Sequence, residues 1–116
     1  MPPRDWAFRV QDILDAIAKI RRFTSDVDFE AFENDEELLD AVVHNLTVIG
    51  EDANHVPAGI ADQHHEIPWR QMIDLRNFSV HAYWNLHPSL IWDTIQNDLP
   101  PLVEPLRKLL PDDGGR

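Results

Sequence analysis

One short run of the sequence combines residue types that can act on a phosphodiester. Arg76 and Asn77 are followed by His81 and Tyr83, all within eight residues. Arginine presents a permanently charged fork to phosphate oxygens, and histidine titrates near neutrality and can therefore transfer protons. Arg76 also falls on an apolar line of its predicted helix, one turn after Met72. A charged side chain at such a position needs either a partner or a function.

These residue types permit cleavage of RNA. RNA supplies its own nucleophile, the 2′-hydroxyl, so cleavage needs only a proton acceptor, a proton donor and stabilisation of the phosphorane charge. His81 can transfer the protons, Arg76 can stabilise the charge, and Asn77 can orient the phosphate or the histidine. We therefore expect no metal ion and no cofactor. The absence of cysteine also removes thiolate nucleophiles and cysteine-based zinc sites.

Each of these residues also has an ordinary structural interpretation. Arg76 can extend toward solvent or pair with a carboxylate such as Glu51 from another helix. Both His81 and Tyr83 can be hydrogen-bonded core residues. On a helix of about 3.6 residues per turn, Arg76 and Tyr83 share a face, whereas His81 is rotated by roughly 140° from Arg76. One helix therefore does not bring all three together, but two copies related by a twofold axis can.

The segments that must position these residues carry helical patterns. Apolar residues recur every three or four positions, as in helices that bury one face. Gly50 is expected to allow close packing between two of the helices. Phe29 and Phe32 are expected to hold a short irregular connection against the core, and 61–67 is expected to be a loop. The predicted helices run from about 4 to 23, 34 or 35 to 56, 68 to 84, and 88 to 109.

The predicted fold class is all-α, an antiparallel up-and-down four-helix bundle, because the sequence has no alternating strand pattern and no internal repeat. Three prolines, Pro100, Pro101 and Pro105, must kink the last helix or split it in two. At 116 residues the chain suits a single domain over 1–110, with a flexible tail at 111–116. The third helix is apolar on two faces, so we expect a homodimer that covers the second face.

Composition limits the other classes of function. The sequence has 10 Lys and Arg against 21 Asp and Glu, a net charge of −11. Phosphate binding recruits clustered cations, so any RNA contact must be local and no DNA partner is expected. No window approaches a membrane span and the beginning of the chain lacks the apolar stretch of a signal peptide. The expected location is therefore the cytoplasm, and no membrane partner is expected.

The pattern of Arg76, Asn77, His81 and Tyr83 resembles the signature of the HEPN superfamily, specifically its HepT-like toxin branch. Flanking blocks extend the resemblance over nearly the whole chain. A minor departure is the polar residues that follow Gly50 and Glu51, where the family tends to small ones. The blocks that carry the resemblance are residues 12–17, 41–42, 49–51, 66–69 and 92–100.

The resemblance implies a homodimeric, metal-independent endoribonuclease, the toxin of a toxin–antitoxin pair. Its partner would be a small antitoxin of the nucleotidyltransferase fold. Tyr83 would accept the adenylyl groups with which that antitoxin silences the toxin. Two other interpretations stay open at this point. One is a non-catalytic nucleotide-binding or assembly partner of a nucleotidyltransferase, which the acidic composition favours slightly, and the other is a plain helical scaffold.

Overall fold

The computed structural model describes residues 5–79 and 87–111. Throughout these ranges the regular secondary structure is helical and contains no strand, so the all-α prediction is confirmed for this part of the chain. None of the helices described here is long and apolar enough to cross a membrane. Of the predicted tail, only Pro111 belongs to the described residues.

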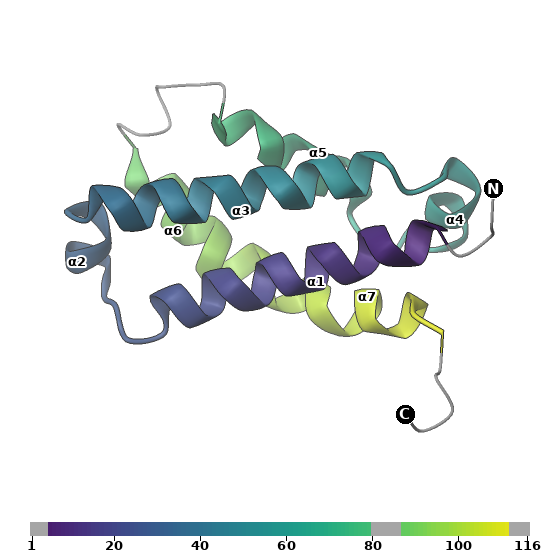
Figure 1. Ribbon diagram of the computed structural model, residues 1–116, viewed down its shortest axis with the longest axis horizontal. Helices are drawn as coiled ribbons and strands as arrows, with labels where there is room; N and C mark the ends of the chain where they lie inside the picture. Colours follow the sequence, from purple (N-terminus) through teal and green to yellow (C-terminus); the bar gives the residue numbers. More distant parts are fainter. Residues whose placement is uncertain (1–4, 80–86, 112–116) are drawn as a thin grey trace.

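Two long antiparallel helices, α1 (Asp5–Thr24) and α3 (Glu36–Asn54), lie side by side (Figure 1). Both follow the predicted ranges closely, because their apolar residues recur with the helical period and are buried between them. Asp35 begins α3 as expected. Its carboxylate accepts a hydrogen bond from the Leu38 backbone N–H at 3.0 Å, which satisfies one of the free donors of the first turn.

The connection between α1 and α3 is helical, not irregular as the sequence suggested. This connection contains the helix α2 (Phe29–Glu33). Asp28 caps its N-terminus, because the Asp28 carboxylate accepts a hydrogen bond from the Ala31 backbone N–H at 2.9 Å. Phe32 is fully buried and packs on Trp92, with ring centroids 5.0 Å apart. The two phenylalanines therefore hold this segment in place as predicted, while the Asp28 cap accounts for its helical turn.

The segment after α3 is also more helical than predicted. The expected loop begins inside a short helix, α4 (Ala58–Gln63). After Pro68 comes α5 (Trp69–Asp74), where the third helix was expected. From residue 75 the backbone tightens into a 3₁₀ helix, η1 (Leu75–Ser79), so the prediction of one regular α-helix through this range is wrong.

The last helix is split, as its prolines predict. It consists of α6 (Pro88–Asp93), a π-helical turn η3 (Thr94–Asp98), a 3₁₀ turn η4 (Pro100–Leu102) and α7 (Val103–Leu109). Pro100 and Pro101 have no N–H to donate to the turn before them. The backbone widens there instead, and Leu99 N–H donates to Thr94 O at 3.0 Å. The segment thereby bends along the long helix pair (Figure 1).

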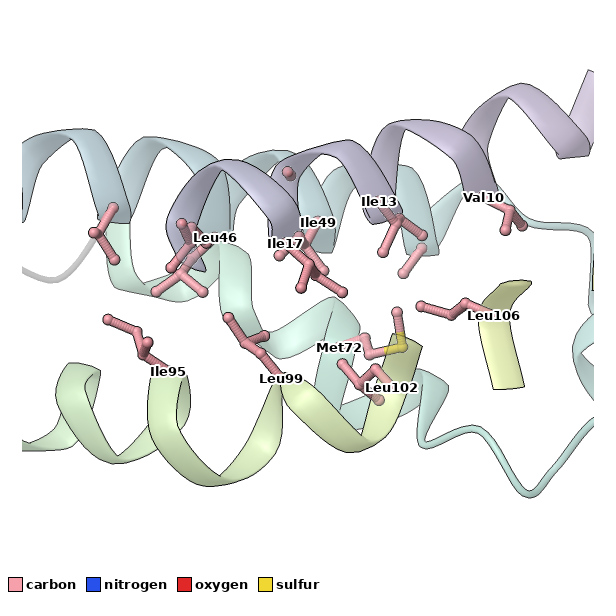
Figure 2. Close-up of a cluster of buried hydrophobic side chains, with 14 of the residues drawn as sticks. Val10, Ile13, Ile17, Leu46, Ile49, Met72, Ile95, Leu99, Leu102 and Leu106 are labelled. Atoms are coloured by element: carbon pink, nitrogen blue, oxygen red, sulfur yellow. The ribbon is translucent and has the colours of Figure 1, made fainter. Parts of the chain in front are cut away.

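The core lies between α1, α3, α5 and the split last segment. Apolar side chains from all four point toward one another in Figure 2, with Ile17, Ile49, Met72 and Leu99 near its centre. These four side chains are at most 1% exposed. This packing fixes α3 as the support on which α5 and η1 rest.

A partly buried ion pair, with an exposed arginine and a buried carboxylate, also joins α1 to α3. Asp52 is 5% exposed, and Arg9 Nη1 donates to its Oδ1 at 3.0 Å. Burial raises the pKa of Asp52 above its ordinary 3.8, and nearby Asp12 adds to the rise, while Arg9 and His55 act in the opposite direction. The pattern that the sequence resembles tends to have small residues after Gly50 and Glu51, and Asp52 departs from it. Asp52 follows Ile49 by three positions and therefore lies on the buried face of α3.

The raised pKa of Asp52 leads to a pH-dependent prediction. The folded protein holds this proton more tightly than the unfolded chain, so the carboxyl favours folding below pH 3.8 and loses that contribution as the pH rises through the folded pKa. Asp52→Asn removes the titration. Urea unfolding should show the variant gaining stability relative to wild type as the pH rises, by about 1.4 kcal/mol per unit of pKa shift. The opposite trend would contradict a raised pKa.

Candidate active site

Arg76 lies on η1 and is held against α3 by an ion pair. Its Nη1 donates to Glu51 Oε1 at 3.0 Å, which confirms the pairing that the sequence suggested. The two side chains are 40% and 53% exposed, so the pair is accessible to solvent. The Arg76 guanidinium, which follows the apolar line of this segment, therefore lies at the surface of the bundle next to the Glu51 carboxylate.

Gly50 makes this arrangement possible. A Cβ atom built at Gly50 would lie 2.7 Å from the Arg76 backbone nitrogen, 2.8 Å from Arg76 Cβ and 2.8 Å from the Ile73 carbonyl oxygen. Any other residue would thus collide with the backbone of η1 and the end of α5. The prediction that Gly50 serves close packing is confirmed. Because Glu51 directly follows Gly50, this contact also brings its carboxylate within reach of Arg76.

Asn77 is exposed on the same 3₁₀ helix as Arg76. With about three residues per turn, its Cβ direction is rotated by roughly 120° from that of Arg76. The described residues therefore bring Arg76 and Glu51 together and place Asn77 beside them on the surface. His81 and Tyr83 lie outside the described residues, and their predicted convergence with Arg76 stays a prediction.

The exposure of the Arg76–Glu51 pair decides what it can do chemically. A surface ion pair is worth about 0–1 kcal/mol, because water screens both charges. An incoming phosphate can therefore replace the carboxylate at little cost. A bidentate guanidinium–phosphate contact is stronger and is directed in geometry. Glu51 suits the role of a group that orients the guanidinium before a phosphate arrives.

Residues 5–79 and 87–111 contain no group of three His, Asp or Glu side chains arranged to hold a metal ion. His64 Nδ1 lies 3.6 Å from Glu66 Oε2, and these two side chains form a pair and not a group of three.

Comparison with known sequences gives a consistent result. The sequence profile of the HepT-like family, described as "Ribonuclease HepT-like", matches residues 13–109. A protein of Thermococcus cleftensis named "Probable ribonuclease HepT" is 36% identical over 100 residues, covering 86% of this chain and 91% of the relative. Two Methanocaldococcus jannaschii proteins, each provisionally named an RNase, are each 30% identical over 112 residues. These alignments cover 97% of this chain and 93% and 97% of the relatives. No solved structure gives a significant match.

The Gly50 contact predicts opposite effects for the same substitution at two glycines. Gly50→Ala should destabilise the fold, because overpacking costs about 1–3 kcal/mol and exceeds the ~1 kcal/mol by which alanine favours a helix. Gly59→Ala is the matched control, since nothing lies within 4 Å of a Cβ there and the substitution should stabilise by about 0.4–1 kcal/mol. Urea unfolding of both variants checks this. A Gly50→Ala protein as stable as wild type would show that the contact is not tight.

Proposed function

We propose that this chain, which belongs to the HepT-like ribonuclease family, is an endoribonuclease. The observation that carries the proposal is the accessible guanidinium of Arg76, held on α3 inside the span that the family profile matches. In the proposed reaction the 2′-oxygen of RNA attacks the adjacent phosphorus and the bond from phosphorus to the 5′-oxygen breaks. The 2′-hydroxyl gives up its proton and the leaving 5′-oxygen gains one. The products are a 2′,3′-cyclic phosphate and a 5′-hydroxyl.

The proposal assigns a role to each candidate residue. Arg76 binds the nonbridging oxygens and stabilises the charge that develops on the phosphorane. His81 transfers the proton as base or acid. Asn77 positions the scissile phosphate, and Glu51 positions the Arg76 guanidinium through the 3.0 Å ion pair. This division of roles needs no metal ion, and we propose that cleavage proceeds in the presence of a chelator.

We further propose that the site is composite. Arg76 and His81 are separated by five positions, and a continuous helix of either the 3₁₀ type seen at Arg76 or the α type would direct them to different sides. Two copies of the bundle, related by a twofold axis, can place the arginine of one protomer beside the histidine of the other. The proposed active form is thus a homodimer of up-and-down four-helix bundles with a shared cleft.

The control of such an activity is part of the proposal. Unregulated RNA cleavage would harm the cell that makes it, which suits the toxin of a toxin–antitoxin pair. The proposed partner is an antitoxin of the nucleotidyltransferase fold, which transfers adenylyl groups to the Tyr83 hydroxyl. The first transfer forms a bond from the tyrosine oxygen to the α-phosphate of ATP and releases pyrophosphate and a proton. Any later transfer joins a ribose hydroxyl of the attached adenylyl group to the α-phosphate of another ATP, again with release of pyrophosphate and a proton. The added negative charge would occupy the cleft and neutralise Arg76.

Removal of either proposed catalytic group should slow RNA cleavage. We expect Arg76→Ala to lower the single-turnover rate by about 10²–10³-fold and His81→Ala by about 10²–10⁴-fold, measured on labelled RNA in buffer with EDTA. Arg70→Ala removes an exposed cation from the neighbouring helix α5 and should cleave at the wild-type rate. Equal rates for wild type and His81→Ala would contradict the proposal and favour the alternative of a non-catalytic nucleotide-binding or assembly partner.

The same two variants test the composite site. When Arg76→Ala and His81→Ala chains are co-expressed, a mixed dimer retains one intact arginine and one intact histidine on opposite protomers. Part of the wild-type rate should return in that preparation. Failure of the mixed dimers to cleave, with both parent variants folded and dimeric, would contradict a shared cleft.

Modification of Tyr83 has a clear mass signature. Incubation with a cognate nucleotidyltransferase and ATP should raise the mass of the chain by whole adenylyl groups and stop RNA cleavage. Tyr83 is the one tyrosine of the sequence, so Tyr83→Phe should gain no mass and stay active. A Tyr83→Phe chain that still becomes adenylylated would show that another residue is the acceptor.

A further inference from the structure

Positive charge is concentrated on two of the helices. The whole chain has 10 Lys and Arg, 21 Asp and Glu, and a net charge of −11. α1 and α7 contain six of these cations and four of the acids, a net charge of +2, which leaves −13 for the rest of the chain. Four of the six cations lie in the last turns, two in each helix. The first turns of α2 and α3 are acidic instead.

α1 and α7 lie side by side (Figure 1). Side chains of the two helices line a groove, which we call the α1–α7 groove. Its hollow measures about 300 Å³. Its lining combines an apolar floor with a guanidinium from each helix. Among the residues that line it are Leu14, Ala18 and Arg21 of α1, Val103 and Arg107 of α7, and Leu110, which directly follows α7.

The outer face of α1 adds an exposed aromatic ring to this surface. Phe8 is 72% exposed, although burial of a phenylalanine side chain is normally favourable. Phe8 shares a side of the helix with Lys19 and Arg22, which are also exposed. Phe8 and Arg22 are separated by about 21 Å along the helix axis. One accessible face thus carries an aromatic ring at one end and cations at the other.

Two carboxylates, Glu104 and Asp15, accompany the cations of the groove. Glu104 Oε2 accepts from Arg107 Nη1 at 2.8 Å, and both side chains are well exposed at 68% and 64%. An exposed pair of this kind is worth about 0–1 kcal/mol, so a phosphate can take the place of the carboxylate. Asp15, which also lines the groove, accepts a hydrogen bond from Gln11 at 2.9 Å.

We propose that the α1–α7 groove binds single-stranded RNA, with Arg21 and Arg107 on phosphates and Phe8 stacked under an unpaired base. A cationic groove beside an exposed aromatic ring is the combination with which proteins hold single strands without sequence preference. The inference rests on the proposed function, because a ribonuclease must hold a polyanion and the charge outside α1 and α7 is strongly negative. The groove lies on α1, whereas Arg76 lies on the side of α3 that η1 covers, so the groove would be a second contact for the strand.

The test uses a fluorescent 2′-O-methyl oligoribonucleotide, which lacks the 2′-hydroxyl and cannot be cleaved. Its affinity for the full chain is measured by anisotropy at several salt concentrations. Arg21→Gln and Arg107→Gln should each weaken binding about 5-fold at 0.1 M salt and reduce the salt slope by about 0.7, as expected for one lost phosphate contact. Arg70→Gln changes the net charge equally on α5 and should bind as wild type.

Phe8→Ala tests the aromatic contact separately from charge. Loss of a stacked base should weaken binding about 5-fold or more. Leu90→Ala is the matched control. Leu90 is the other exposed large apolar side chain among the described residues, with 39% of it exposed, and it lies on α6. That variant should bind as wild type.

The outcomes separate this inference from the proposed function. If Arg21→Gln, Arg107→Gln and Phe8→Ala all keep the wild-type affinity and salt slope, or wild type does not bind the oligonucleotide, the groove does not hold RNA. Cleavage of ordinary RNA by wild type would leave the proposed function intact in that case. If binding falls in the groove variants but wild type cleaves no RNA, the groove inference stands and the proposed function fails.

Discussion

The tight contact between Gly50 and the backbone of η1 determines where the candidate catalytic arginine lies. No side chain larger than hydrogen fits at that point of α3, since a Cβ would lie under 3 Å from three atoms of α5 and η1. The 3₁₀ helix can therefore rest directly on α3, and Arg76 meets the carboxylate of the next residue, Glu51. The rest of the fold supports this contact, because α3 is held rigidly by α1 on one side and receives α5 and η1 on the other (Figure 1).

Two ion pairs on α3 illustrate how burial divides structural from chemical roles. Asp52 is buried beside the exposed Arg9, so desolvation raises the pKa of Asp52 and removal of Arg9 would leave a buried carboxyl group without its partner. Glu51, the residue before it, is half exposed and pairs with Arg76 in water. The first pair fastens α1 to α3. The second can exchange its carboxylate for a phosphate, which is the property required of a group that meets a substrate.

Local pattern predicts much of this arrangement. The period of the apolar residues predicts α1 and α3, Asp35 predicts the start of α3, and the prolines predict the split of the last segment. Gly50 and the Glu51–Arg76 pair were also predictable, since a glycine in a helix and a cation on an apolar line both need a reason. The change from α5 to a 3₁₀ helix was not predictable, because it accompanies a tertiary contact with α3 and local propensity contains no information about such a contact. The proposed convergence of Arg76 with His81 requires a second copy of the chain, and the sequence of one chain does not give the position of that copy.

The central proposal is that the position of Arg76 on α3 determines the rate of RNA cleavage, and the cleavage rate of Gly50→Ala tests it most directly. The rate should be measured on RNA under conditions where the variant is fully folded by circular dichroism, with Gly59→Ala beside it. A displacement of about 1 Å at the guanidinium is enough to lower the rate roughly 10²-fold, so Gly50→Ala should cleave far more slowly than wild type, and Gly59→Ala at the wild-type rate. A folded Gly50→Ala protein that cleaves RNA as fast as wild type would contradict the account.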